Sequence, residues 1–322
     1  MTLLSLLILL SGVFVGWNLG ANDAANAMGT AVGARVRTIR EAVIIVAVFS
    51  LAGALAFGHR VIKTIGRGIV PLDQLDPRQA TLIALAAMLA AGVWLLWATY
   101  LKLPVSTTHS TVGAVAGAGL AAGGVPIFWG QLVDIFLAWI LTPVGAAIVA
   151  YVLYQALQIL VMRHVAIPDR IWGWLLTASG MWMAFSWGAN DVANATGVIV
   201  GASLMSPFAA SLVGGLAIVL GIATWGYRVM ETVGTRITHL IPPMAFIAEV
   251  AAALNVQLYT LLGLPVSTTH SIVGAVFGVG LVFGRAAIDP RTARDIVLAW
   301  AATPLAAGFV SAVLFLLLAR IV

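Results

Sequence analysis

The chain has 322 residues, of which 62% are hydrophobic and only 8% are charged, with a formal net charge of +5 and no cysteine. A soluble domain carries about 25% charged residues, so this composition excludes a water-soluble globular protein and indicates an integral membrane protein. The lack of cysteine excludes a disulfide framework and thiol chemistry. We interpret the positive charge as Lys and Arg in the cytoplasmic loops of a multi-pass cell-membrane protein, and not as a surface for nucleic acid.

Ten apolar runs approach or exceed the length that crosses a bilayer as a helix, which is about 20 residues. In chain order they cover residues 3–34, 41–58, 79–101, 104–122 and 134–160, and then 171–202, 208–227, 241–262, 265–284 and 295–320. We expect helices because strand alternation is absent and a spanning segment must satisfy its own backbone groups. The runs divide the chain into a first membrane repeat over 1–162, a short link over 163–170 and a second membrane repeat over 171–322.

Two polar motifs interrupt the apolar runs, and each of them occurs twice. The sequence GANDAANA begins at Gly20 and returns as GANDVANA at Gly188. The sequence LPVSTTHS begins at Leu103 and returns at Leu264. Because each half contains one copy of both motifs, the chain is built from two related repeats.

Basic residues indicate that the two repeats have opposite orientations. Arg35, Arg37 and Arg40 follow the first GAND motif, whereas the equivalent loop at 203–208 contains no Lys or Arg. Cytoplasmic loops are enriched in Lys and Arg, so we expect the first loop inside and its counterpart outside, with both termini outside. Segment 60–78 is the exception, because it is expected outside and yet is basic. The predicted fold is therefore all-α, with two inverted-topology repeats of about five segments and with broken or re-entrant helices at the GAND and PVSTTHS motifs.

Three acids lie well inside apolar runs, namely Asp23, Asp191 and Glu249. A carboxylate in the bilayer centre costs at least about 2.5–3.5 kcal/mol, so such acids usually face a polar cavity and have a function. The alternative is a buried acid that only hydrogen-bonds to neighbouring helix ends. Gly20 and Gly188 precede the two aspartates at positions where a helix could unwind and free carbonyl oxygens for an ion.

Helical spacing groups the polar side chains of each GAND motif on one face. The two sets are Asn22, Asp23 and Asn26 in the first copy, and Asn190, Asp191 and Asn194 in the second. Carboxylate and amide oxygens are hard ligands, which suit Na⁺ or a similar cation better than a soft metal.

The PVSTTHS motifs predict the N-termini of two helices. Ser106, Thr107 and Thr108 in one copy, and Ser267, Thr268 and Thr269 in the other, offer hydroxyl groups beside unpaired backbone N–H groups. Such a terminus binds anions, although for a single copy ordinary capping is the favoured interpretation. Two copies in inverted repeats favour a paired anion site near the middle of the membrane. His109 and His270 could ligate, shuttle protons or orient these hydroxyls, and a structural donor role is favoured.

With both motifs read, the chain resembles the inorganic phosphate transporter (PiT) family of cation-coupled symporters. The resemblance implies a homodimer that holds phosphate between its inverted halves, with Na⁺ as the coupling ion and H⁺ as the alternative. Carried over by position, the cation ligands are Asn22, Asp23, Asn190 and Asp191; the phosphate ligands are Asn26, Asn194, Ser106, Thr107, Thr108, Ser267, Thr268 and Thr269; the supporting residues are Glu249, His109 and His270.

One departure from the family pattern leaves another oxyanion open as the substrate, one departure from symmetry makes the site unequal, and two further functions are weighed beside them. Ser50 stands where many family members have a glutamate, and the repeat counterpart of Glu249 is Met88. The alternatives are a transporter of another oxyanion such as sulfate, an intramembrane aspartyl-type hydrolase built on two carboxylates that share a proton, and a channel.

Overall fold

The computed structural model describes residues 3–100, 105–227, 230, 240–284 and 290–321, and this part of the chain is helical without a strand. The first half contains α1 (Leu3–Asp23), α2 (Ala25–Gly33), α3 (Ile39–Lys63), η1 (Thr64–Gly68), η2 (Leu72–Gln74), α4 (Pro77–Tyr100), α5 (Thr107–Ala122), α6 (Trp129–Leu157) and η3 (Gln158–Met162). The second half contains α7 (Asp169–Gly201), α8 (Pro207–Gly221), η4 (Ile222–Gly226), α10 (Pro242–Leu261), α11 (Thr268–Leu281) and α12 (Pro290–Ile321). Each of the ten predicted runs therefore corresponds to a helix or, for the first run, to a pair of helices.

Seven helical segments of the described chain are long and apolar enough to cross a membrane. Helix α7 is not among them, although it is 33 residues long. Every residue of α7 from Ser186 to Gly201 is buried by neighbouring helices. A helix that is surrounded by protein does not need an apolar surface for lipid, so α7 can carry the polar GAND motif in its C-terminal half.

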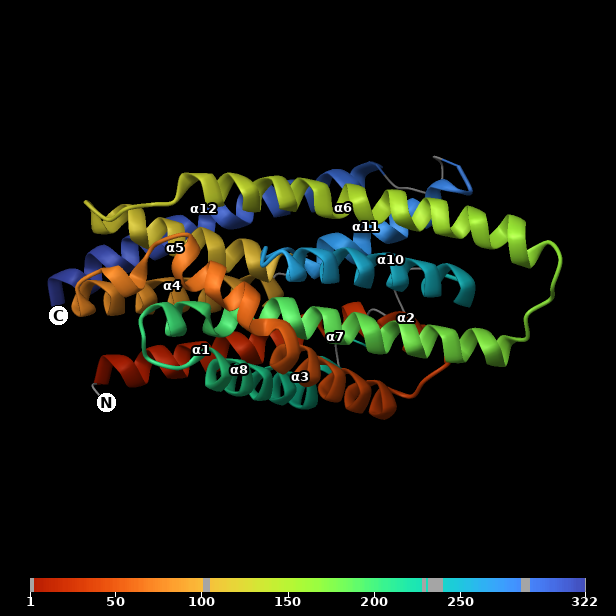
Figure 1. Ribbon diagram of the computed structural model, residues 1–322, viewed down its shortest axis with the longest axis horizontal. Coiled ribbons are helices and arrows are strands. Elements are labelled where there is room, and N and C mark those ends of the chain that lie inside the picture. The colour runs from red at the N-terminus through yellow and green to blue at the C-terminus, as the bar shows by residue number, and fades with distance from the viewer. Residues whose placement is uncertain (1–2, 101–104, 228–229, 231–239, 285–289, 322) are drawn as a thin grey trace.

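The two repeats run in opposite directions, as the basic residues predict. In Figure 1, α1 begins at the end of the molecule that holds both termini, whereas α7 begins at the opposite end, after the link from α6. The loop between α2 and α3, which contains Arg35 and Arg37, lies at the end away from the termini, and the loop between α7 and α8 lies at the end near them. The arginine-rich loop and its counterpart therefore lie on opposite faces.

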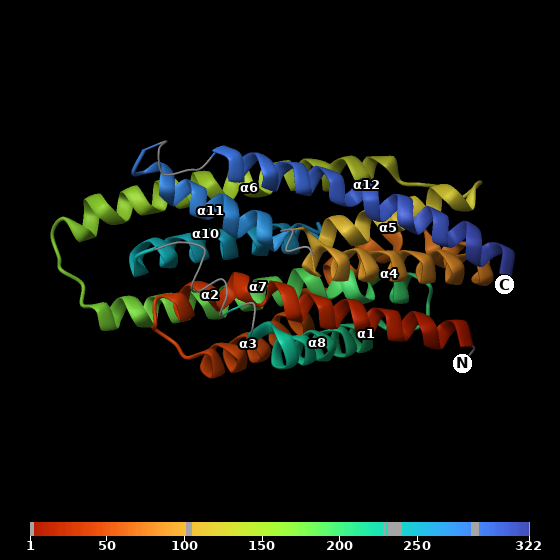
Figure 2. The same ribbon diagram turned by 180° about the vertical axis from the view of Figure 1, so that it is seen from behind.

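Each repeat contains a hairpin that enters from one end and turns back near the middle. Helices α4 and α5 lie in the half of the molecule near the termini, and α10 and α11 lie in the other half, with the tip of the α10–α11 hairpin between the two halves (Figures 1 and 2). Both tips carry PVSTTHS motifs, of which Pro104 lies outside the described residues. Helices α4 and α10 are each long and apolar enough to cross a membrane, so a re-entrant segment at these motifs stays a prediction.

The GAND motifs differ in backbone structure despite their similar sequences. The first motif contains only a one-residue interruption, because α1 ends at Asp23 and α2 begins at Ala25, while Ala24 between them keeps helical dihedral angles (φ −55°, ψ −30°). The second motif lies within α7, which is continuous from Asp169 to Gly201. The predicted broken helix is therefore wrong for the second copy, where the surrounding helices hold one continuous helix.

Gly20 and Gly188 permit close helix crossings and do not mark unwound helix. A methyl group at Gly20 would overlap the backbone carbonyl of Ile218 in α8, and one at Gly188 would overlap that of Ser50 in α3. Ser50 and Ile218 are separated by the same offset as the two glycines, so the two crossings are repeat counterparts. Glycines also allow the hairpin helices to pack closely against their neighbours, since Gly274 of α11 lies against Pro143 of α6 and Gly113 of α5 lies against Pro304 of α12.

The Gly274→Ala variant is expected to destabilise the protein by about 1–3 kcal/mol, because the added methyl group forces α11 away from the Pro143 backbone. The measurement is thermal unfolding in detergent. Gly130→Ala is the matched control, since a methyl group at this helical position meets no atom within 4 Å. If both variants unfold at the temperature of the unsubstituted protein, the close crossing is not a stability determinant.

Candidate functional site

Two N-terminal caps place the PVSTTHS hydroxyls at the centre of the molecule. The Ser106 side chain accepts a hydrogen bond of 3.2 Å from the backbone N–H of His109, and the Ser267 side chain accepts one of 3.2 Å from that of His270. Both serines are extended residues that immediately precede α5 and α11. The prediction that these motifs start helices is confirmed, and the caps orient the threonines that follow.

Within each repeat, a threonine of the hairpin contacts the aspartate of the GAND motif. The Thr107 hydroxyl donates to Asp23 Oδ2 over 3.3 Å, and the Thr268 hydroxyl donates to Asp191 Oδ2 over 3.4 Å. All four side chains are buried. The structure therefore brings the predicted cation ligands and the predicted phosphate ligands of each repeat into direct contact.

Between the repeats, an asparagine of one half contacts a threonine of the other. Asn26 Nδ2 donates to Thr269 Oγ1 over 3.0 Å, and Asn194 Nδ2 donates to Thr108 Oγ1 over 3.0 Å. These bonds and the two threonine–aspartate bonds join all four motifs into one polar group. We call it the central cluster, and it consists of Asp23, Asn26, Thr107, Thr108, Asp191, Asn194, Thr268 and Thr269.

Two buried oxygen atoms of the central cluster have no hydrogen-bond partner within the described chain. They are Asp191 Oδ1 and Asn194 Oδ1, and helical spacing places the two side chains on one face of α7. A buried acceptor without a partner costs about 1–3 kcal/mol, and more if it is charged. A carboxylate oxygen beside an amide oxygen fits a hard monovalent cation such as Na⁺, which would satisfy both.

The two remaining asparagines of the GAND motifs have unequal surroundings. Asn22 Nδ2 donates to Asp23 Oδ1 over 3.3 Å. Asn190 instead holds the second hairpin tip, because its Nδ2 donates to Leu264 O over 3.2 Å and its Oδ1 accepts from Val266 N over 3.1 Å. The assignment of Asn22 and Asn190 as cation ligands stays a prediction, and Asn190 has a positioning contact that the sequence did not suggest.

Solvent exposure is unequal across the pseudo-twofold relation. Asn26 and Thr269 are partly exposed, whereas their repeat counterparts Asn194 and Thr108 are fully buried. The described conformation is therefore asymmetric around the central cluster, although the sequences of the motifs are nearly the same.

Glu249 lies in a second buried polar group, which the sequence analysis did not predict in full. Its carboxylate accepts hydrogen bonds from the hydroxyl groups of Thr30 in α2 and Ser179 in α7, the latter over 2.6 Å. Thr30 follows Asn26 by one helical turn, and this spacing could have identified it. Ser179 carries no comparable signal, because only the fold brings it to Glu249.

His109 and His270 belong to a stack of four aromatic rings. The ring of His109 stacks on Trp139 with centroids 3.7 Å apart, the ring of His270 stacks on Trp300 at 3.5 Å, and the two histidines meet edge to face at 4.5 Å. His109 Nδ1 lies 3.1 Å from Trp300 O. The His109 contact fits the structural donor role, whereas neither ring nitrogen of His270 has a hydrogen-bond partner within the described chain. A supporting role of either histidine in transport stays a prediction.

Ser50 does not offer a substitute for the glutamate that many family members have there. Its side chain is buried, and the hydroxyl donates to Ala47 O over 3.3 Å. Its backbone carbonyl faces Gly188 at the crossing of α3 and α7. Ser50 therefore contributes to helix crossing.

Comparisons with known proteins agree on one family. The sequence pattern of the phosphate transporter family matches residues 19–311. A protein of Pyrococcus abyssi that carries the name of a phosphate permease is 34% identical, over 97% of this chain and 97% of its own. The chloroplastic inorganic phosphate transporter 2-1 of Arabidopsis thaliana is 32% identical, over 94% of this chain and 70% of its own. A solved structure described as the sodium-dependent phosphate transporter is 30% identical, with a TM-score of 0.90 over the whole of both chains.

Proposed function

Because this chain belongs to the phosphate transporter family, we propose that it imports inorganic phosphate by symport with Na⁺ through alternating access. It is a multi-pass membrane protein, and its relatives are transporters and permeases and not enzymes. The aspartyl-type hydrolase is thereby excluded.

The observation that carries the sodium proposal is the pair of open acceptor oxygens at Asp191 and Asn194. Neither the GAND nor the PVSTTHS motifs contain a Lys or Arg, so the polypeptide places no permanent cation within them. A bound Na⁺ would supply positive charge beside the threonine hydroxyls and the N-termini of α5 and α11, where phosphate oxygens accept hydrogen bonds. Phosphate and Na⁺ then stabilise one another, which is the physical basis of symport.

Alternating access is supported by the inverted repeats and by the unequal exposure of equivalent residues. In this conformation Asn26 and Thr269 are the accessible pair, and Asn194 and Thr108 are the closed pair. Exchange of these two environments would move a substrate from one face to the other while the central cluster stays in place. A homodimer and the boundaries of the repeats at 162 and 171 remain parts of the proposal.

The test is uptake of labelled phosphate into proteoliposomes, with Na⁺ and H⁺ gradients imposed separately. We expect an inward Na⁺ gradient to drive accumulation and an H⁺ gradient alone to drive little. Unlabelled phosphate inside the vesicles should accelerate uptake by counterflow, which a channel does not show. Excess sulfate should compete weakly. Accumulation driven only by an H⁺ gradient would show that H⁺, and not Na⁺, is the coupling ion. Equal competition by sulfate would show that the transporter is not specific for phosphate.

A further inference from the structure

Three basic side chains line a cleft of about 390 Å³ that lies apart from the central cluster. Arg60, Lys63 and Arg67 come from the end of α3 and from η1, and the cleft also borders the tip of the α10–α11 hairpin. Asp73 lies 3.3 Å from Arg67, but neither Arg60 nor Lys63 forms an ion pair within the described chain. The cleft therefore carries net positive charge.

The cleft lies towards the face that the basic-residue pattern assigns to the outside. Arg60 follows the start of α3 at Ile39 by 21 residues, so at 1.5 Å per residue it lies about 30 Å further along the helix, which is about the thickness of the hydrocarbon core. α3 starts beside the arginine-rich loop at the opposite end of the molecule (Figure 1). Basic residues in outer loops do not serve membrane orientation, so this group calls for another explanation.

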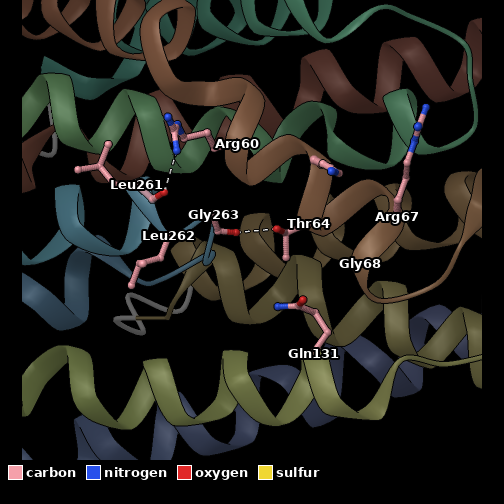
Figure 3. Close-up of a pocket in the computed structure, with 9 residues that line it drawn as sticks. Arg60, Thr64, Arg67, Gly68, Gln131, Leu261, Leu262 and Gly263 are labelled. Atoms are coloured by element: carbon pink, nitrogen blue, oxygen red, sulfur yellow. Dashed lines mark hydrogen bonds between the residues drawn. The ribbon is translucent and has the colours of Figure 1, made fainter.

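Arg60 and Thr64 hold the hairpin tip that forms one wall of the cleft. Figure 3 shows Arg60 directed at Leu261, where its Nη1 donates to the backbone carbonyl over 3.0 Å. The Thr64 hydroxyl donates to Gly263 O over 2.6 Å. One hydrogen bond orients the Arg60 guanidinium and leaves its other N–H groups for a ligand. Gln131 of α6 lies on the other side of Thr64, and the Arg67 side chain points away from Thr64 and Gly263 (Figure 3).

The hairpin tip leads from this cleft directly to the central cluster. Gly263 is followed by Leu264, whose carbonyl accepts from Asn190, and the chain then reaches Thr268, which contacts Asp191. An anion held by Arg60 and Lys63 would therefore be bound at the outer side of the tip that carries the predicted phosphate ligands.

We propose that the Arg60–Lys63 cleft is an outer binding site for free inorganic phosphate, which captures the anion before it enters the central cluster. This inference rests on the proposed function. Guanidinium and ammonium groups suit the oxygens of a phosphate dianion. A cleft lined by one sign of charge focuses the field and raises the association rate of the opposite ion by about 10- to 1,000-fold. The central motifs have no Lys or Arg to do this themselves.

The test uses the absence of native cysteine and the exposure of Lys63. Lys63→Cys should raise the KM for phosphate about fivefold at low ionic strength, with kcat unchanged, because capture weakens and translocation does not. A membrane-impermeant trimethylammonium-ethyl methanethiosulfonate added outside should restore the KM. The sulfonatoethyl reagent, which adds a negative charge, should raise it further. High ionic strength should reduce all three differences.

Arg78→Cys is the matched control, since Arg78 is exposed near the start of α4 on the same face and does not line the cleft. Its KM should respond to neither reagent. If both reagents change the KM of the Lys63→Cys variant alike, the effect is steric and the outer site is disproved. If the unsubstituted protein takes up no phosphate under any cation gradient, the proposed function fails instead.

A lipid phosphate has the same chemistry, so the assay is repeated in phosphatidylcholine vesicles with and without phosphatidylglycerol. The same charge-dependent KM shift in both supports free phosphate as the ligand. A shift that needs the anionic lipid would assign the cleft to a headgroup and overturn the proposal.

Discussion

Sodium-driven phosphate uptake is expected to fall about a hundredfold or more when Asp191 is replaced by asparagine. Asp191 is fully buried, with one oxygen bonded to Thr268 and the other without a partner. Two unit charges 4 Å apart interact by about 4 kcal/mol at the effective dielectric constant of a protein, so loss of the carboxylate charge removes most of the attraction for Na⁺. Asparagine keeps the size and can still accept from Thr268, so the fold should persist.

The measurement is initial uptake as a function of external Na⁺, with Asp169→Asn as the control. Asp169 lies in the first turn of the same helix and is exposed. Asp23→Asn should have a smaller effect than Asp191→Asn in this conformation, because Asn22 and Thr107 already bond to both oxygens of Asp23. Unchanged sodium dependence in the Asp191→Asn variant would show that this acid is structural.

The helices and their orientation were predictable because each depends on short stretches of sequence. A spanning helix needs about 20 apolar residues, which can be counted in the sequence. The arginines at 35–40 indicate that their loop is cytoplasmic, and this inference does not depend on the rest of the fold. The N-caps at Ser106 and Ser267 were also predictable, since capping is set within three residues.

Contacts that depend on tertiary structure could not be predicted in the same way. The bond between Asn26 and Thr269 joins residues 243 positions apart, and no local pattern places them together. The one-residue interruption at Ala24 and its absence at Val192 occur in nearly identical motifs, so the local sequence does not decide between them. The unwinding predicted at Gly20 was wrong because that glycine allows α8 to approach α1.

The Thr269→Val variant is expected to raise the KM for phosphate about tenfold, with a smaller change in sodium dependence. The Thr269 hydroxyl accepts from Asn26 and has no acceptor within the described chain, so its own hydrogen is free to meet a phosphate oxygen. Valine keeps the shape and removes the hydroxyl, which leaves the Asn26 amide and one phosphate oxygen without a partner. Each such loss costs about 1–3 kcal/mol. Partial exposure makes Thr269 reachable in this conformation.

Three further threonines make this expectation specific. Thr111→Val is the control, because its hydroxyl bonds only to the preceding turn and the repeat counterpart is Ile272. Thr108→Val should affect the phosphate KM less than Thr269→Val, since the Thr108 hydroxyl already donates to Val266 O over 3.0 Å. Thr268→Val should weaken Na⁺ as well as phosphate, because Thr268 contacts Asp191. Equal KM values for the Thr269→Val variant and the unsubstituted protein would exclude Thr269 as a phosphate ligand, and the cross-repeat bond to Asn26 would then serve only to join the two halves.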